Sequence, residues 1–252
     1  MARSDFRTPR LFVEDDSVPN LAPGLTLRLA PEQQNYLGNV LRLGAGDRVL
    51  IFNGRDGEWL ATIAGRKRPE TLEIVNQTRP QGTPARLRYA FAPLKHARLD
   101  YMVQKAVEMG ATVLTPVLTQ HTQVTRTNLE RMRANVIEAA EQCGILSIAE
   151  VEEPLPLPRF LENRDPAQPL VFCDEEAEEA SAIEALRPLA QQAAQGIAQG
   201  IDVLIGPEGG FAAPERALLL KQANVVRLSL GPRILRADTA AVAALALVQA
   251  VR

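Results

Sequence analysis

The sequence is poor in the residues that build several common kinds of site. It contains two cysteines, Cys143 and Cys173, whose spacing matches no metal-binding pattern. The two histidines are too few for a typical zinc site. We therefore expect no metal centre. Aromatic residues make up only 4% of the chain, so the core must depend on aliphatic side chains.

The sequence also shows no pattern typical of a targeting or membrane-spanning segment. No apolar run is long enough to cross a bilayer. Residues 1–10 carry three arginines but lack the apolar segment of a signal peptide. We therefore expect a cytoplasmic protein with no membrane partner, whose two cysteines stay reduced and lie in the core.

Three common nucleotide-binding and catalytic motifs are missing. The chain has no G-x-x-x-x-G-K-[ST], which argues against a nucleoside triphosphatase, and no G-x-G-x-x-G, which argues against a Rossmann dinucleotide site. It also has no G-x-S-x-G of the hydrolase type. What remains is a chain of 252 residues, 46% hydrophobic and 23% charged, which suits one large globular domain or two smaller ones.

The charges are unevenly distributed along the chain. Residues 66–105 contain nine basic residues against three acidic ones, and residues 150–184 contain eleven acidic residues against two arginines. This asymmetry indicates either a surface for a polyanion or two solvated surfaces of opposite sign. The pattern alone does not choose between them.

The first part of the chain has the composition of short strands. Five of them, separated by glycine-rich turns, are predicted at residues 11–13, 25–29, 48–52, 58–63 and 71–75. Strands this closely spaced predict a small barrel. One short helix beginning at Pro31 interrupts them, with Tyr36, Leu37, Val40 and Leu41 as its apolar stripe. Residues 79–84 have linker composition, so we predict domains at 1–80 and 81–252.

Beyond the linker, predicted strands alternate with helices. The strands lie at residues 87–92, 113–117, 170–173, 202–205 and 225–230. Helices are predicted at 99–109, at 127–143 with a Thr127–Glu130 capping box, after Ser181, from Pro214, and at 239–251. This order predicts a parallel sheet covered on both faces. The last helix is apolar almost all round, so it is a core helix, a subunit interface or both.

Three loops follow the carboxyl ends of predicted strands, where open α/β sheets place their ligands. They come after Phe172-Cys173, at Ile205–Phe211 and at Leu230–Ala240. Glycines in the second loop let the backbone approach a ligand closely. The third loop combines apolar residues with Arg233 and Arg236, just before a helix. The second loop alone could be a simple turn, but the three together predict a binding site.

Ile205–Phe211 together with Leu230–Ala240 resemble the motifs of the RsmE-type methyltransferases of the SPOUT class. Further matches, which extend the resemblance over nearly the whole chain, are Asn39–Arg42 with Gly46-Asp47, Lys95 with Asp100–Gly110, and Glu138–Cys143. The chain departs from the pattern at Ile145, where an arginine is expected, and near Ala149, where a proline is expected.

The resemblance implies a fold and a cofactor. The fold is α/β, a SPOUT trefoil-knot domain with a parallel sheet, preceded by a small PUA-like β-barrel. The cofactor is S-adenosylmethionine, and the assembly is a homodimer. The cofactor-binding residues expected in the three loops are Cys173, Ile205, Gly206, Gly209, Leu230, Gly231, Leu235 and Thr239.

The resemblance also implies a reaction, the methylation of N3 of a uridine in bacterial 16S ribosomal RNA, free or in the small subunit. Uracil N3 carries a proton, so the reaction needs a base and a group that stabilises the resulting anion. Arg236 is the first candidate for stabilisation and Arg233 the second. Glu208 is the preferred base, because Glu215 and Asp238 stand where helix starts favour acidic residues.

The RNA phosphates would be held by basic residues of both domains: Arg10, Arg42, Arg66, Lys67, Arg68, Lys95 and Lys105. Two other functions stay open at this point. One is an RNA-binding module without catalysis. The other is a transferase that acts on another RNA or on a small nucleotide.

Overall fold

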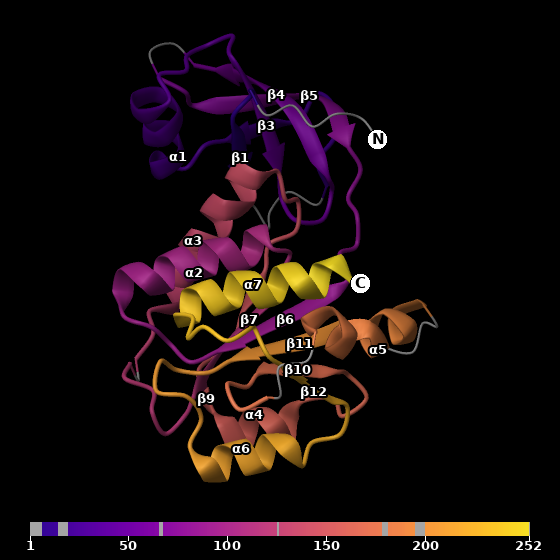
Figure 1. Ribbon diagram of the computed structural model, residues 1–252. Coiled ribbons are helices and arrows are strands. Elements are labelled where there is room, and N and C mark those ends of the chain that lie inside the picture. The colour runs from indigo at the N-terminus through magenta and orange to yellow at the C-terminus, as the bar shows by residue number, and fades with distance from the viewer. Residues whose placement is uncertain are drawn as a thin grey trace. The chain divides into compact units, whose positions relative to one another are not determined.

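The structure, a computed structural model, describes residues 7–14, 20–65, 68–124, 126–177, 181–194 and 200–251 (Figure 1). The chain divides into two compact units. The first unit comprises residues 1–83 with residues 140–148, and the second comprises residues 84–139 with residues 149–252. The long helix α3 (Leu129–Cys143) therefore contributes its last residues to the first unit.

The first unit is built on a five-stranded sheet in the order β1-β3-β4-β5-β2. Neighbouring strands are antiparallel except for β1 and β3, which are parallel. Side chains of β4 alternate between buried and half-buried positions, as expected for a strand with one face on a core. The predicted strands of this region are confirmed, with the bounds β1 Arg10–Phe12, β2 Thr26–Arg28, β3 Arg48–Phe52, β4 Glu58–Ala64 and β5 Thr71–Arg79.

The helix that begins at Pro31 changes its geometry part of the way along. An α-helical turn, α1 (Pro31–Asn35), continues as a π-helical turn over residues 36–40, in which the Leu41 N–H donates to the Tyr36 carbonyl at 2.9 Å. The wider turn breaks the 3.6-residue repeat. Leu37 is buried, but Val40 is 61% exposed, so the predicted apolar stripe is wrong at Val40.

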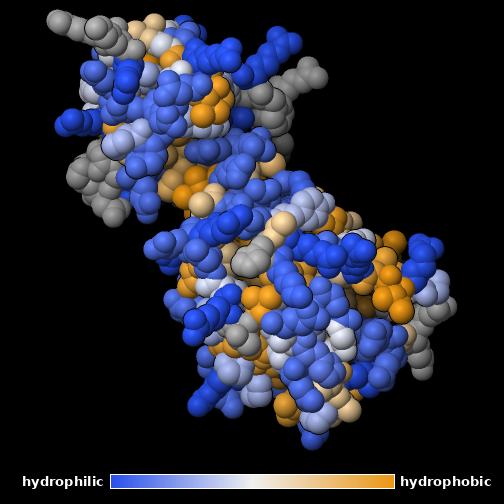
Figure 2. All heavy atoms as spheres, turned by 90° about the vertical axis from the view of Figure 1, so that its left-hand side faces the viewer, coloured by the Kyte–Doolittle hydropathy of each residue, from blue (hydrophilic) through white to orange (hydrophobic). Residues whose placement is uncertain are grey.

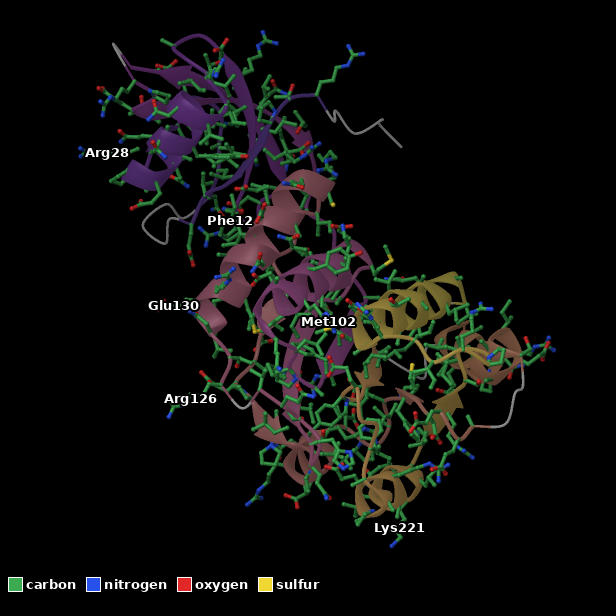
Figure 3. The ribbon with its side chains drawn as sticks, turned by 60° about the vertical axis from the view of Figure 1, so that its left-hand side comes forward. Phe12, Arg28, Met102, Arg126, Glu130 and Lys221 are labelled. Carbon is green, nitrogen blue, oxygen red and sulfur yellow. The ribbon has the colours of Figure 1, made fainter. Side chains whose placement is uncertain are left out.

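Phe12 shows how the first unit includes the end of α3. Phe12, which is labelled in Figure 3, donates its N–H to the Glu141 carboxylate at 2.8 Å. Arg79 donates to the Gly144 carbonyl at 3.0 Å, just beyond the helix. The second contact satisfies a backbone carbonyl at the end of the helix, where intrahelical partners are missing.

The second unit contains a parallel sheet in the order β12-β10-β11-β6-β7-β8, with β9 paired to β7. The α/β fold class with a parallel sheet behind a small β domain is confirmed. The strands are β6 Arg86–Phe91, β7 Val113–Leu118, β8 Glu150–Val151, β9 Leu155–Pro156, β10 Leu170–Cys173, β11 Gly200–Ile205 and β12 Val225–Leu228. All six residues of β11, in the middle of the sheet, are buried.

Helices cover both faces of this sheet, as predicted. Figure 1 shows α2 (His96–Glu108) and α7 (Ala237–Ala250) on one face, and α4 (Leu157–Asn163) and α6 (Ala213–Leu220) on the other. Helix α7 packs against α2, β11 and α5 (Ala182–Ala194). Its core-facing side chains, which include Leu245 and Val248, are buried.

Two details of the second unit differ from the prediction. Helix α4 and the two-residue strands β8 and β9 were not predicted, because elements this short give no periodic signal. Helix α3 is capped by Asn128, whose side-chain oxygen accepts the Arg131 N–H at 3.0 Å, and not by Thr127. In the ranges covered by the structure, no helix is both long enough and apolar enough to span a membrane.

Candidate functional site

The loops that follow β10, β11 and β12 enclose a cavity of about 290 Å³. The three strands are neighbours or next neighbours in one parallel sheet, so their carboxyl ends meet at one edge. This confirms that the three predicted loops come together. The lining residues are Cys173 to Ala177, Ile205 to Glu208, Gly210, Phe211, Arg216, Leu228 to Leu235, Ala237 and Ala240.

The loop after β11 is closely packed at two of its glycines. A Cβ atom at Gly206 would lie 2.9 Å from the Phe211 ring. Gly210 has a φ of +68°, and a Cβ atom there would lie 2.7 Å from the Glu175 carboxylate. The loop therefore presents bare peptide groups to the cavity, which suits hydrogen bonding to a ligand held close to the backbone.

A buried carboxylate fixes the loop after β10. Asp174 accepts hydrogen bonds from Arg216 at 3.0 and 3.1 Å and from Arg227 at 2.8 Å. Burial raises the pKa of Asp174, but these hydrogen bonds and that from the Glu176 N–H outweigh it, so the pKa is lowered overall. Arg216 also pairs with Glu176 at 3.0 Å. In this wall of the cavity the charges of Asp174 and Glu176 are thus paired with arginines.

Most of the residues predicted to hold a cofactor line the cavity: Cys173, Ile205, Gly206, Leu230, Gly231 and Leu235. Gly209 and Thr239 are not among the lining residues. The Gly209 carbonyl faces the His121 ring, and the Thr239 N–H donates to Asp238 at 2.8 Å. Burial raises the pKa of the Cys173 thiol to about 12, so this side chain contacts the cavity as a neutral group.

The predicted catalytic arginines occupy different positions. Arg233 lines the cavity, whereas Arg236 is the exposed N-cap residue of α7 and does not line it. Within the described residues neither arginine forms an ion pair. Both guanidinium groups can therefore bind an anion or a carbonyl oxygen without first breaking a contact.

The predicted bases are also separated by the structure. Glu208 lines the cavity and forms a half-exposed ion pair with Arg98 at 3.4 Å. Glu215 accepts the N–H groups of Ala212 at 3.0 Å and Gln120 at 2.8 Å, so it serves the start of α6. Asp238 is not the cap of α7, because the helix begins one residue earlier, at Ala237.

Of the basic residues predicted to contact RNA, Arg42, Arg68 and Lys95 are exposed, and Arg42 has a φ of +58°. Arg10 is different, because its side chain is 3% exposed and pairs with Glu58 at 2.9 Å. Its burial removes it from the surface that could contact phosphate. Lys105 pairs with Glu108 at 2.6 Å. Arg66 and Lys67 lie outside the described residues.

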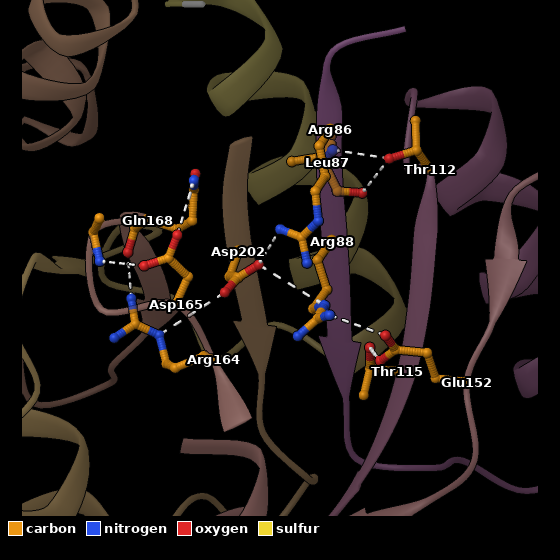
Figure 4. A network of polar contacts seen from close by, with 11 residues as sticks. Arg86, Leu87, Arg88, Thr112, Thr115, Glu152, Arg164, Asp165, Gln168 and Asp202 are labelled. Carbon is orange, nitrogen blue, oxygen red and sulfur yellow. Dashed lines mark hydrogen bonds and ion pairs between the residues drawn. The ribbon is translucent and has the colours of Figure 1, made fainter. Parts of the chain in front are cut away.

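Much of the basic stretch at residues 66–105 is neutralised inside the protein. Asp202, on β11, is buried among three arginines, with distances of 3.1 Å to Arg86, 3.9 Å to Arg88 and 3.8 Å to Arg164 (Figure 4). Arg88 also pairs with Glu152 at 2.9 Å. The excess of basic residues in the sequence therefore overstates the positive charge available at the surface. Figure 2 shows a face dominated by hydrophilic side chains, among which smaller apolar areas are scattered.

Several residues of the site escaped prediction. Asp174 and Glu175 directly follow a predicted strand, but they stood within a long acidic stretch and gave no separate signal. Arg216 and Arg227 reach the site from a helix and a strand far along the chain, so only the fold brings them there. In the part of the chain covered by the structure, no group of three or more potential ligands could hold a metal ion.

Comparisons with known proteins agree with this organisation. A family model described as an RNA methyltransferase domain matches residues 81–249, and one described as an RNA methyltransferase PUA domain matches residues 29–75. The chain is 32% identical over 231 residues to ribosomal RNA small subunit methyltransferase E of Rickettsia conorii, covering 91% of each chain. It is 31% identical to the protein of the same name from Synechocystis, covering 89% of this chain and 73% of that one.

Solved structures show the same fold. A putative methyltransferase of Legionella pneumophila, in complex with S-adenosylmethionine, has a TM-score of 0.78 and 28% identity, covering 97% of this chain and 98% of that one. Ribosomal RNA small subunit methyltransferase E of Neisseria gonorrhoeae has a TM-score of 0.80 over the same shares of the two chains, at 24% identity. Because the domain models match and relatives align along nearly its whole length, the chain belongs to the RNA methyltransferase family that includes ribosomal RNA small subunit methyltransferase E.

Proposed function

We propose that this protein transfers a methyl group from S-adenosylmethionine to N3 of a uridine in 16S ribosomal RNA, in the cytoplasm. The observation that carries the proposal is the cavity formed by the three loops, within the region that matches the RNA methyltransferase domain. The methyltransferases of Rickettsia and Synechocystis are named for the small-subunit RNA, and the Legionella structure holds S-adenosylmethionine.

The cavity suits this cofactor by its chemistry and its size. Ile205, Leu230 and Leu235 offer apolar side chains to an adenine ring, and the tight loop at Gly206 offers peptide groups for hydrogen bonds. A volume of about 290 Å³ is at the lower end of the range for small-molecule sites. When bound, S-adenosylmethionine supplies a methyl group on a positively charged sulfur. We propose that all eight residues predicted to bind the cofactor either contact it or support the residues that do.

The chain's own groups must deal with the proton on uracil N3. We propose that Arg236 stabilises the deprotonated base by donating to a carbonyl oxygen on which negative charge develops. Its exposure and freedom from ion pairs within the described residues support this role. Arg233, on the cavity wall, is the second candidate. Glu208 is the proposed proton acceptor. In this role its carboxylate would accept the N3 proton while it also forms the ion pair with Arg98.

The RNA backbone is proposed to bind exposed basic residues of each unit. Arg42 and Arg68 belong to the first unit and Lys95 to the second. Phosphate contacts of this kind fix the orientation of an RNA and make its binding dependent on salt. Lowering the ionic strength should therefore tighten RNA binding, and an Arg42→Ala, Arg68→Ala double variant should show a shallower salt dependence in a filter-binding titration.

We propose that the protein is a homodimer that uses helix α7. One side of α7 is buried within the unit, but a second side, with Val242, Ala243, Ala246 and Leu247, is only half-buried or exposed. Small apolar residues let two helices approach closely. Ala246→Glu with Leu247→Glu should give monomers in sedimentation, while the fold persists. Variants at buried Leu245 or Val248 would test folding instead. A wild-type monomer at tens of micromolar would contradict the proposal.

A mass-spectrometric map of 16S ribosomal RNA tests the reaction. Cells that lack this protein should lose one N3-methyluridine, and the wild-type gene should restore it. Loss of a different modification would leave the methyltransferase assignment intact but overturn the proposed atom. If no modification changes and titration shows no binding of S-adenosylmethionine, the protein is an RNA-binding module without catalysis.

A further inference from the structure

The glycine loop of the cavity, residues 206–211, is contacted by a residue that does not itself line the cavity. His121 lies in the loop between β7 and α3, and its Nδ1 atom is 3.0 Å from the Gly209 oxygen and 3.1 Å from the Gly210 oxygen. Both partners are acceptors, so Nδ1 must carry a proton and donate. A Cβ atom at Gly209 would be 3.3 Å from the His121 Cβ atom, so the two loops are also in close contact.

We propose that His121 is a positioning residue for the cofactor, holding the Gly209–Phe211 peptide groups in the orientation that the cavity requires. This inference rests on the proposed function, because it takes the cavity to be the cofactor site. It adds a residue outside the three loops, whose side chain acts through the backbone of the second loop.

The loop needs such a contact because its own residues restrain it weakly. Two successive glycines can adopt many backbone conformations, and Gly210 occupies the left-handed region at a φ of +68°. Inside this turn, the Gly210 N–H donates to the Pro207 carbonyl at 2.9 Å. That bond fixes one side of the turn. It does not fix the peptide group between Gly210 and Phe211.

The contact with His121 fixes that peptide group. A peptide unit is planar and trans, so its N–H points away from its carbonyl oxygen. When the Gly210 carbonyl faces His121, the Phe211 N–H, which lies in the same peptide plane, must point in the opposite direction. Gly210 and Phe211 both line the cavity. A single donor behind the loop can therefore decide which polar atoms a ligand meets.

The backbone on both sides of His121 is held in place, which keeps its exposed side chain beside the glycine loop. The Thr119 N–H donates to the Thr122 hydroxyl at 2.8 Å, and the Thr122 N–H donates to the Thr119 carbonyl at 3.1 Å. The neighbouring Gln120 N–H donates to Glu215 at 2.8 Å, at the start of α6. These bonds tie the His121 turn to the element that follows the glycine loop.

The test compares three variants of the full chain. His121→Ala removes the donor, His121→Asn places an amide N–H near the position of Nδ1, and Gln123→Ala changes an exposed residue of the same loop as a control. Binding of S-adenosylhomocysteine is measured by calorimetry, and amide hydrogen exchange of residues 206–211 is measured in the cofactor-free protein. RNA binding and the melting temperature are recorded for each variant.

We expect His121→Ala to weaken binding roughly 3- to 10-fold, the effect of one lost hydrogen bond, and to speed exchange of the loop by a similar factor. His121→Asn should recover much of both effects, and Gln123→Ala should match wild type. RNA affinity and melting temperature should barely change, which separates positioning from a general loss of structure. Wild-type affinity and exchange in His121→Ala, or no recovery in His121→Asn, would overturn the inference. If wild type fails to bind S-adenosylhomocysteine, the proposed cofactor is wrong, and unchanged exchange in His121→Ala would then reject the contact separately.

Discussion

The amino ends of the parallel sheet hold a buried, paired arginine, whereas the loop after β12 at the carboxyl ends holds two exposed arginines. At the amino ends of the strands, Arg164 has a side chain that is 1% exposed and lies beside the equally buried Asp202 (Figure 4). At the carboxyl ends, Arg233 and Arg236 are exposed and form no ion pair within the described residues. A buried ion pair holds a structure together only while both partners remain. An exposed, unpaired guanidinium contributes little to stability but can bind a ligand.

Asp202→Asn should have the largest effect on stability. The substitution removes the carboxylate between Arg86, Arg88 and Arg164 and leaves buried positive charge without compensation. We expect a loss of about 3–5 kcal/mol in the free energy of unfolding. Glu162→Gln, the same change in the exposed Arg159–Glu162 pair, is the matched control and should cost less than about 1 kcal/mol. Equal unfolding curves for the two variants would show that burial of the ion pair does not increase the stability lost when its carboxylate is removed.

Arg236→Ala should instead impair the reaction and spare the fold. If the guanidinium acts on developing charge, kcat should fall by roughly 10²–10³, as for the loss of one donor in an oxyanion hole. The melting temperature and cofactor affinity should stay near wild type. Arg236→Lys should rescue little, because an ammonium lacks the planar pair of donors. A normal kcat would move the assignment to Arg233, and a lowered melting temperature would make Arg236 structural.

Gly206→Val should affect cofactor binding at the carboxyl end. A Cβ atom at this position already lies 2.9 Å from the Phe211 ring, so the larger side chain must displace the ring or enter the cavity. We expect affinity for S-adenosylhomocysteine to fall at least about tenfold, which corresponds to about 1.4 kcal/mol. Gly44→Ala is the control, because nothing lies within 4 Å of its Cβ position. Unchanged affinity in calorimetry would mean that this loop does not hold the cofactor.

The contribution of the paired acid in the cavity wall should depend on pH. Hydrogen bonds from Arg216 and Arg227 lower the pKa of Asp174 below its value in the unfolded chain, despite the opposing effect of burial. Such a group stabilises the fold above its unfolded pKa, near 4, and the contribution is lost as the pH falls further. Thermal unfolding of Asp174→Asn should therefore differ from wild type at pH 7, and the difference should shrink below about pH 4. A constant difference would exclude this linkage.

The sequence was a good guide to elements whose pattern is periodic or marked by glycine and proline. Helix α3 ends at Cys143 because Gly144 adopts a φ of +66°, and α6 begins beside Pro214, as expected. The π-helical turn at residues 36–40 was not foreseen, since a change of hydrogen-bond register leaves no mark in hydrophobic spacing.

The site was predictable as three loops but not as a set of contacts. Strand order placed the loops together, and backbone glycines marked the closest approach. Arg10 shows what composition cannot reveal, because a basic residue near the start of a predicted barrel strand could equally face solvent or a buried acid. The Glu58 carboxylate, which accepts from both Arg10 and Arg79, decides the matter, and it comes into range only through the pairing of β1, β3, β4 and β5.

The strand order of the second unit has a consequence for the time course of folding. Strand β11 lies between β6 and β10, although it follows β6 by more than a hundred residues along the chain. The hairpin-like pairs β3–β4 and β4–β5 of the first unit are local by comparison. Contacts across long separations form slowly. The cavity needs the loop after β11, so a refolding chain should regain S-adenosylhomocysteine binding only in its slowest phase, and stopped-flow refolding with a fluorescent analogue would detect it. The recovery of ligand binding would then show when β11 has taken its place in the middle of the sheet.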